Sequence, residues 1–246
     1  MLFFLRQIRR KLMNENKFTT YLLYAVGEIV LVVVGILIAV QIDTWSDSRK
    51  DEDKVKKHIE ALKKELAGNL LVLKEDLAYS QEKLDTIAVL QKIMTKEGSD
   101  IETLISLARY HFDFAYDSDV HLNNITFQTL ESTGEIGLLD QALRDSLYNY
   151  QAELKKSSNI IKYNYDFYAE LDKEYHAIYP PSGEDYFLQG ELANEVWESI
   201  DKKDFLLRFN ALVSNKLLTE IHAKLWKSML VAETQSFLSF INEKYP

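Results

Sequence analysis

The feature of this sequence that most constrains its fold is an uncharged stretch near the N-terminus. Between Phe18 and Ile42 the only charged residue is Glu28, and the run from Ile29 to Val40 contains only apolar or small residues. As a helix, these 25 residues would be about 37 Å long, and a bilayer core needs about 20 residues of this kind. We therefore predict a transmembrane helix over residues 18–42.

Aromatic residues flank this stretch, as they do at the interfaces of many membrane spans. Tyr21 and Tyr24 lie toward its N-terminal end, and Trp45 follows its C-terminal end. The competing interpretation is a cleaved signal peptide, because the unbroken apolar run also fits the h-region of such a peptide. The leader before the run is long, and residues 37–42 offer poor small-residue pairs for a peptidase. The sequence therefore favours a retained signal anchor.

The distribution of charge predicts the direction of the span. The chain of 246 residues has a net charge of −9, but residues 1–20 carry +4 and the remainder −13. Positively charged flanks stay in the cytoplasm, so we expect a cytoplasmic leader over residues 1–17 and a periplasmic body over residues 43–246 of a single-pass inner-membrane protein. An acidic body also argues against a nucleic-acid partner, because phosphate contacts need clustered Lys and Arg.

The span and its flanks resemble an uncharacterised family of single-span inner-membrane proteins from Bacteroidota. The family pattern reads Tyr-Ala-x-Gly-Glu-Ile-x-Leu-Val, then Gly-Ile-Leu-Ile-Ala-x-Gln-Ile and a Trp. This chain matches it at Tyr24, Ala25, Gly27, Glu28, Ile29, Gly35, Gln41, Ile42 and Trp45. It departs after Ile42, where Asp43, Thr44, Ser46 and Asp47 replace the expected Asn-rich residues. Residues 126–151 are similar to the family's central segment. The resemblance implies a topology but no activity.

A carboxylate within the predicted span needs an explanation, because acids are costly in a bilayer. Glu28, Gly35 and Ala39 are separated by seven and four residues, so they share one helix face. The pair Gly35 and Ala39 has the small-xxx-small spacing that lets two helix backbones approach closely. One hypothesis is a packing face shared with another span. The alternative is a tolerated interfacial acid, partnered by Lys17 or Tyr24 of its own or a neighbouring chain.

The body is predicted to be all-α, because 8 Gly and 3 Pro leave few turns and the apolar residues recur at helical spacing. Long helices are expected over residues 51–96, 140–178 and 201–243, and short ones over 99–110 and 125–133. A capping box at Ser99 and Glu102 and a cap at Asp140 are expected to begin two of them. Residues 111–124 are expected to be a loop. The economical arrangement is an elongated antiparallel bundle following one transmembrane helix.

Three apolar stripes are expected to form the core of this bundle. The first comprises Val55, Ile59, Leu62, Leu66, Leu70, Leu73, Leu77, Leu84, Ile87, Leu90 and Met94, with a stutter between Leu66 and Leu70. The second comprises Leu143, Leu147, Tyr150, Leu154, Ile161, Tyr165, Tyr168 and Tyr175. The third comprises Phe205, Phe209, Leu212, Leu217, Ile221, Leu225, Met229, Phe237, Leu238 and Ile241.

No catalytic, cofactor or metal site is predicted. The chain lacks Cys, and its five histidines fall in no zinc-binding spacing. The acidic loop beginning at Asp117 resembles a calcium loop only at its start, because Leu122 and Gln128 replace the required Gly and Glu. We therefore expect a protein that is not an enzyme.

The predicted function is a membrane-anchored interaction or scaffold module of the bacterial cell envelope. Its expected partners are the lipid bilayer and another protein or a second copy, through the span and the bundle. The alternative is a periplasmic ligand-sensing bundle that signals through a partner protein, because the predicted cytoplasmic segment is too short for an output domain.

The packing hypothesis for the span predicts different effects for two substitutions. Gly35→Leu should strongly reduce association of the span, because it forces the helix backbones apart, whereas Glu28→Gln should be mild, because the amide keeps a hydrogen bond. Such bonds between spans are worth about 0.6 kcal/mol on average. Cross-linking of the full chain in membranes measures both effects. Unchanged association of the Gly35→Leu variant would show that this face contacts lipid.

Overall fold

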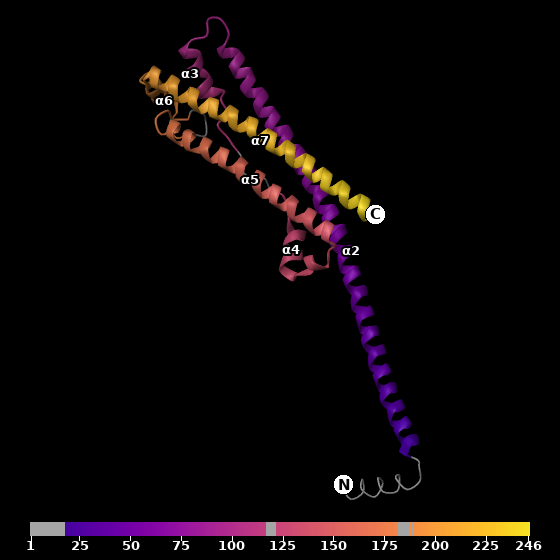
Figure 1. Cartoon of the computed structure of the whole chain (residues 1–246). Helices are drawn as coiled ribbons and strands as arrows, with labels where there is room; N and C mark the ends of the chain where they lie inside the picture. The colour runs from indigo at the N-terminus through magenta and orange to yellow at the C-terminus, as the bar shows by residue number, and fades with distance from the viewer. Residues whose placement is uncertain (1–17, 117–121, 182–186, 188) are drawn as a thin grey trace, which may run out of the picture. The chain divides into compact units, whose positions relative to one another are not determined.

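The computed structural model describes residues 18–116, 122–181, 187 and 189–246, and divides the chain into compact units of residues 1–57 and 58–246. The described residues are mostly helical and contain no strand, which confirms the predicted all-α class. The helices are α2 (Phe18–Met94), α3 (Ile101–Tyr110), α4 (Ile125–Thr133), η1 (Glu135–Leu138), α5 (Gln141–His176), α6 (Gly190–Glu198) and α7 (Lys202–Lys244) (Figure 1).

Helix α2 is one element where two helices were expected. Residues 43–50 continue it because they contain no Gly or Pro to end the helix. The hydroxyls of Thr44 and Ser48 donate to the carbonyl oxygens four residues earlier, at 2.8 and 2.9 Å, so these polar side chains are accommodated within the helix. The N-terminal part of α2 is long and apolar enough to cross a membrane, and none of its most apolar window is buried within the chain. Among the described residues it is the one helix that meets these criteria.

The body is a bundle in which α7 runs antiparallel to both α5 and the part of α2 that begins at His58 (Figure 1). Helices α5 and α7 form the most extensively packed pair. Tyr150 and Thr234 lie 3.1 Å apart, oxygen to oxygen, near one end of this pair, and Tyr165 donates to Glu220 at 3.0 Å farther along. Helix α2 joins α7 through Lys227, which donates to Ser80 at 3.1 Å.

The buried seam of α5 was predicted correctly, since every residue of its expected stripe is buried. The stripe of α2 is buried or half-buried throughout, but its expected stutter is wrong. Asn69 is buried where Leu70 was expected, so the seam continues from Leu66 through Asn69 to Leu73 in unbroken heptad phase. The apolar pattern gave a wrong prediction here because Asn69, the residue that continues the heptad phase, is polar.

The expected stripe of α7 is correct at its ends and wrong in its middle. Ile221, Leu225 and Met229 are exposed, and Leu217 is half-buried. The residues that point inward there are mostly polar: Lys216, Thr219, Glu220, Ala223, Lys227, Leu230 and Thr234. Lys216, Thr219, Ala223 and Leu230 follow the heptad spacing set by Phe205, Phe209 and Leu212. Glu220, Lys227 and Thr234 form a second heptad series, shifted by one residue, that continues to Ile241. The middle of α7 therefore turns its charged side chains inward and its apolar ones outward.

Aspartate side chains cap three of the helices, as free backbone N–H groups at helix N-termini require. Asp140 accepts from the Leu143 amide at 3.1 Å, as predicted, and Asp201 accepts from two amides at the start of α7. The expected capping box at Ser99 is wrong by one residue, because Asp100 accepts from the Thr103 amide at 2.9 Å. Helix α6 was not predicted; its Trp197 is buried in the core.

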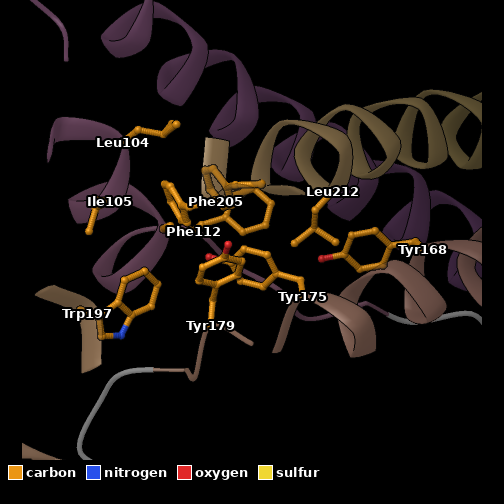
Figure 2. Packing of buried hydrophobic residues seen from close by; sticks show 11 residues of the cluster. Leu104, Ile105, Phe112, Tyr168, Tyr175, Tyr179, Trp197, Phe205 and Leu212 are labelled. Carbon is orange, nitrogen blue, oxygen red and sulfur yellow. The ribbon is translucent and has the colours of Figure 1, made fainter. Parts of the chain in front are cut away.

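An aromatic cluster closes the end of the bundle where α3, α6 and the start of α7 meet (Figure 2). The rings of Phe205 and Phe209 stack at 5.5 Å, and Tyr179 packs on Phe205 edge-on at 5.4 Å. The Tyr179 hydroxyl donates to Asp204 at 2.5 Å. Tyr179 thus packs its ring and directs its hydroxyl to a polar partner, which is ordinary helix packing. The buried hydroxyl of Tyr175, in the same cluster, has no hydrogen-bond partner among the described residues.

The buried Asn69 predicts a measurable loss of stability on truncation. Its side chain donates to the Asn123 carbonyl and accepts from the Asn123 amide, both at 2.8 Å. Asn69→Ala leaves both backbone groups without this partner and should lower the free energy of unfolding by about 2 kcal/mol. Asn159→Ala, at an exposed position of α5, is the matched control and should change it by less than about 0.5 kcal/mol. Denaturation of the full chain in detergent measures both, and equal losses would contradict the prediction.

Candidate functional site

The most unusual site in the body surrounds an irregular segment, Phe112–Tyr116, that follows α3. Its backbone carbonyl groups are bound by side chains from three helices. Tyr168 of α5 donates to the Phe114 carbonyl at 3.1 Å, and Lys83 of α2 donates to the Ala115 carbonyl at 3.0 Å. Lys216 of α7 donates to the carbonyls of Asp113 and Ala115, the latter at 2.9 Å. These side-chain hydrogen bonds replace the backbone hydrogen bonds that the carbonyl groups of a helix or a sheet would accept.

Two lysine side chains converge at this site, and both are buried. Lys83 is 8% exposed and Lys216 is 3% exposed. Because they donate to the same Ala115 oxygen, their ammonium nitrogens lie within about 6 Å of each other. Lys216 also lies 5.3 and 5.4 Å from the ring centroids of Phe112 and Tyr168. We refer to Lys83 and Lys216 as the lysine pair.

Burial of the positive charge lowers the pKa of Lys216 to about 8, because an ammonium ion loses hydration there. The positive charge of Lys83 lowers that pKa further, whereas the carboxylates of Asp113, Glu220 and Asp172 act in the opposite direction. Burial also raises the pKa of the Tyr168 hydroxyl strongly, which keeps it a hydrogen-bond donor. The lysine pair thus holds cationic groups in a region of low dielectric.

The carboxylate on the same side of α7 is only partly paired. Glu220 is fully buried, and its Oε2 atom accepts from the Tyr165 hydroxyl at 3.0 Å. Its Oε1 atom has no hydrogen-bond partner within the described part of the chain. Asp113 lies on the solvent side and accepts from the Ala115 amide at 2.9 Å, which shapes the turn of the irregular segment.

Two cavities lie near the lysine pair, and the smaller of them is lined by it. The smaller, of about 140 Å³, is lined by Lys83, Lys216 and Asp113 together with Tyr79, Glu82, Thr86, Ile87, Leu90 and Phe112. The larger is a groove of about 250 Å³ between α2, α3 and α7, and its lining is mostly apolar. Leu90 and Phe112 line both cavities, so the two cavities adjoin each other.

The residues predicted from the sequence lie elsewhere, on the N-terminal part of α2. Glu28, Gly35 and Ala39 are all exposed within the chain, and a Cβ atom added at Gly35 would meet nothing within 4 Å. Trp45 is also exposed, with the Arg49 guanidinium 4.5 Å above its ring. The side chains of Tyr21 and Tyr24 lie outside the described residues. The packing face and the interface anchors therefore stay predictions.

The lysine pair was not predicted from the sequence, because isolated lysines belong to no motif. The available signal was the heptad phase, since Lys216 follows Phe209 and Leu212 at seam spacing. Among the described residues no group of three His, Asp or Glu side chains could hold a metal ion. Asp117, Asp119 and His121 of the acidic loop lie outside the described residues.

A family model described as "Family of unknown function (DUF6090)" matches residues 28–208, which includes most of the span and the body through the start of α7. No curated protein and no solved structure matches the chain.

The lowered pKa of Lys216 predicts how stability depends on pH. In the unfolded chain this lysine has its ordinary pKa of 10.5, whereas in the folded chain its pKa is about 8, so the unfolded state binds more protons between these values. Stability should therefore rise with pH above about 8, and this gain is lost as pH falls through the folded pKa. The full contribution is about 3 kcal/mol.

Unfolding of the wild type and the Lys216→Met variant between pH 7.5 and about 9.5, below the ordinary pKa of tyrosine, measures this contribution. The slope should be steeper in the wild type, and the exposed-site variant Lys92→Met should keep the wild-type slope. Equal slopes for wild type and Lys216→Met would contradict the prediction.

Proposed function

Since the chain belongs to the family of unknown function DUF6090, we propose from its own residues that it is a membrane-anchored, non-catalytic interaction module of the bacterial cell envelope. Its N-terminus lies in the cytoplasm, the N-terminal part of α2 crosses the inner membrane, and the body lies in the periplasm. The basic leader, the apolar length of α2 and the acidic body support this arrangement.

The observation that supports the proposed interaction is the lack of charged residues on the outer face of α7. Between Arg208 and Glu233, the exposed positions of this fully described helix contain no Lys, Arg, Asp or Glu. Lys216, Glu220 and Lys227 are buried, and Lys224 is half-buried, where it donates to Gln81. A surface helix ordinarily shows the opposite pattern, with charges toward water.

Four large apolar side chains on this face form what we call the outer stripe: Leu218, Ile221, Leu225 and Met229. Leu218 and Leu225 are each 53% exposed. The spacing of three and four residues places the stripe along one side of the helix, with a width that matches the seam of a single packing helix. We therefore expect the occupant to be an amphipathic helix of a partner protein, which lays an uncharged apolar face on the stripe.

A second candidate function is ligand sensing by the body, with the signal passed to a partner protein. The observation that favours it is the lysine pair beside a mostly apolar groove, since ligand sites are concave, largely apolar and marked by a few placed polar groups. The two functions are compatible, because the outer stripe and the lysine pair lie on opposite sides of α7.

Site-specific photo-cross-linking in native cells tests the interaction. A photoreactive residue in place of Leu225 should give one adduct with a different protein, and Leu218→Lys in the same chain should abolish it. The same residue in place of Asn159, an exposed position of α5, is the control and should give none.

Equal adducts at positions 225 and 159, or no adduct at position 225, would refute the proposal that a partner protein binds the outer stripe. An adduct with the mass of two chains would show that a second copy of this chain, and not a different protein, occupies the outer stripe. A topology reporter fused after Glu243 should be active only in the periplasm, and activity in the cytoplasm would overturn the proposed location.

A further inference from the structure

We propose that the body binds a free fatty acid of medium chain length, with its carboxylate on the lysine pair and its hydrocarbon chain in the groove between α2, α3 and α7. This inference deepens the ligand-sensing candidate and is independent of the outer stripe. It depends on two features that adjoin each other, a pair of buried cations and an apolar groove.

The lysine pair has hydrogen-bond donors to spare. An ammonium group has three N–H donors. Within the described residues, Lys216 gives two of them to carbonyl oxygens and Lys83 gives one to the Ala115 carbonyl. Both side chains line the smaller cavity, where a buried donor without an acceptor is costly. A carboxylate is acceptor-only and could accept from both ammonium groups at once.

Charge explains why the ligand should be an anion. Two positive charges within about 6 Å of each other repel, and burial strengthens that repulsion. Glu220 shares its buried carboxylate with Tyr165, whereas Glu82 and Asp113 line the same cavity as the lysine pair but are exposed to solvent, which screens their charges. An anion between the ammonium groups would compensate both charges and would favour the protonated form of Lys216.

The groove explains why the anion should carry a hydrocarbon chain. Its lining includes Met94, Leu104, Leu107, Phe209, Val213 and Leu217, and it shares Leu90 and Phe112 with the lining of the smaller cavity. A water molecule takes up about 30 Å³ of the liquid, and a methylene group is of similar size, so the groove of about 250 Å³ accommodates roughly eight carbon atoms. A bare phosphate would leave this apolar surface in water.

Photolabelling of the full chain in lipid nanodiscs tests the proposal, with decanoic acid carrying a terminal diazirine as the probe. Labelling should saturate and map to residues that line the groove. Octanoate should compete at least about tenfold better than octanol, because the alcohol lacks the carboxylate that the lysine pair would bind.

Two pairs of variants locate the site. Ser214→Trp should abolish labelling, because Ser214 is exposed at the groove and a large side chain there fills it. Ser236→Trp places the same side chain at an exposed position of α7 outside the groove and should label like the wild type. Lys83→Gln should weaken labelling at least about tenfold. Lys92→Gln, at an exposed position of the same helix, should not.

Several results would overturn the proposal. Equal competition by octanol would indicate an apolar groove without a carboxylate site, and competition by inorganic phosphate would indicate an anion site without the chain. Labelling that survives Ser214→Trp would place the ligand elsewhere. If Lys83→Gln does not fold, the comparison of octanoate with octanol and the tryptophan pair decide the outcome. None of these results bears on the cross-linking at Leu225, so the two proposals fail separately.

Discussion

The structure of the body depends on the hydrogen bonds that pair polar side chains buried in its helical seams. An unpaired buried polar group costs about 1–3 kcal/mol, so a pairing that satisfies such a group excludes the neighbouring registers. Asn69 meets Asn123, Tyr150 meets Thr234 and Lys227 meets Ser80. An apolar seam would tolerate a slip of one helical turn, whereas these pairs would be broken by it. The polar residues thus specify how α2, α5 and α7 align.

The same pairs explain the unusual outer face of α7. The seam positions in the middle of that helix are taken by charged residues such as Lys216, Glu220 and Lys227, which find their partners inside the bundle. Apolar residues therefore occupy the opposite side, where an isolated bundle would carry charges. With its inner face packed in the bundle and an apolar outer face, α7 resembles a helix that packs on two sides. The polar residues that set its alignment in the core therefore also leave the outer stripe available for the proposed partner.

The irregular segment after α3 connects the fold to the candidate ligand site. Lys83, Lys216 and Tyr168 hold its carbonyl oxygens, and Phe112 of the same segment lines both the smaller cavity and the groove. The cations that support an otherwise unpaired backbone are therefore also the groups that a carboxylate would approach. A ligand at the lysine pair would contact α2, α7 and the irregular segment at once, which is the arrangement needed for binding to alter how they pack.

The sequence by itself determined the helical class, the apolar stretch of α2, the order of the long helices and the buried face of α5, because these follow from local composition and from apolar periodicity. It did not reveal which face of α7 is buried in its middle, that Asn69 keeps the phase of α2, or that Lys83 and Lys216 converge. Apolar periodicity identifies a buried face only when that face is apolar. Where a seam is polar, burial is decided by hydrogen-bond partners such as Ser80 and Tyr165 on other helices, far away in the chain, and only the tertiary structure brings them together.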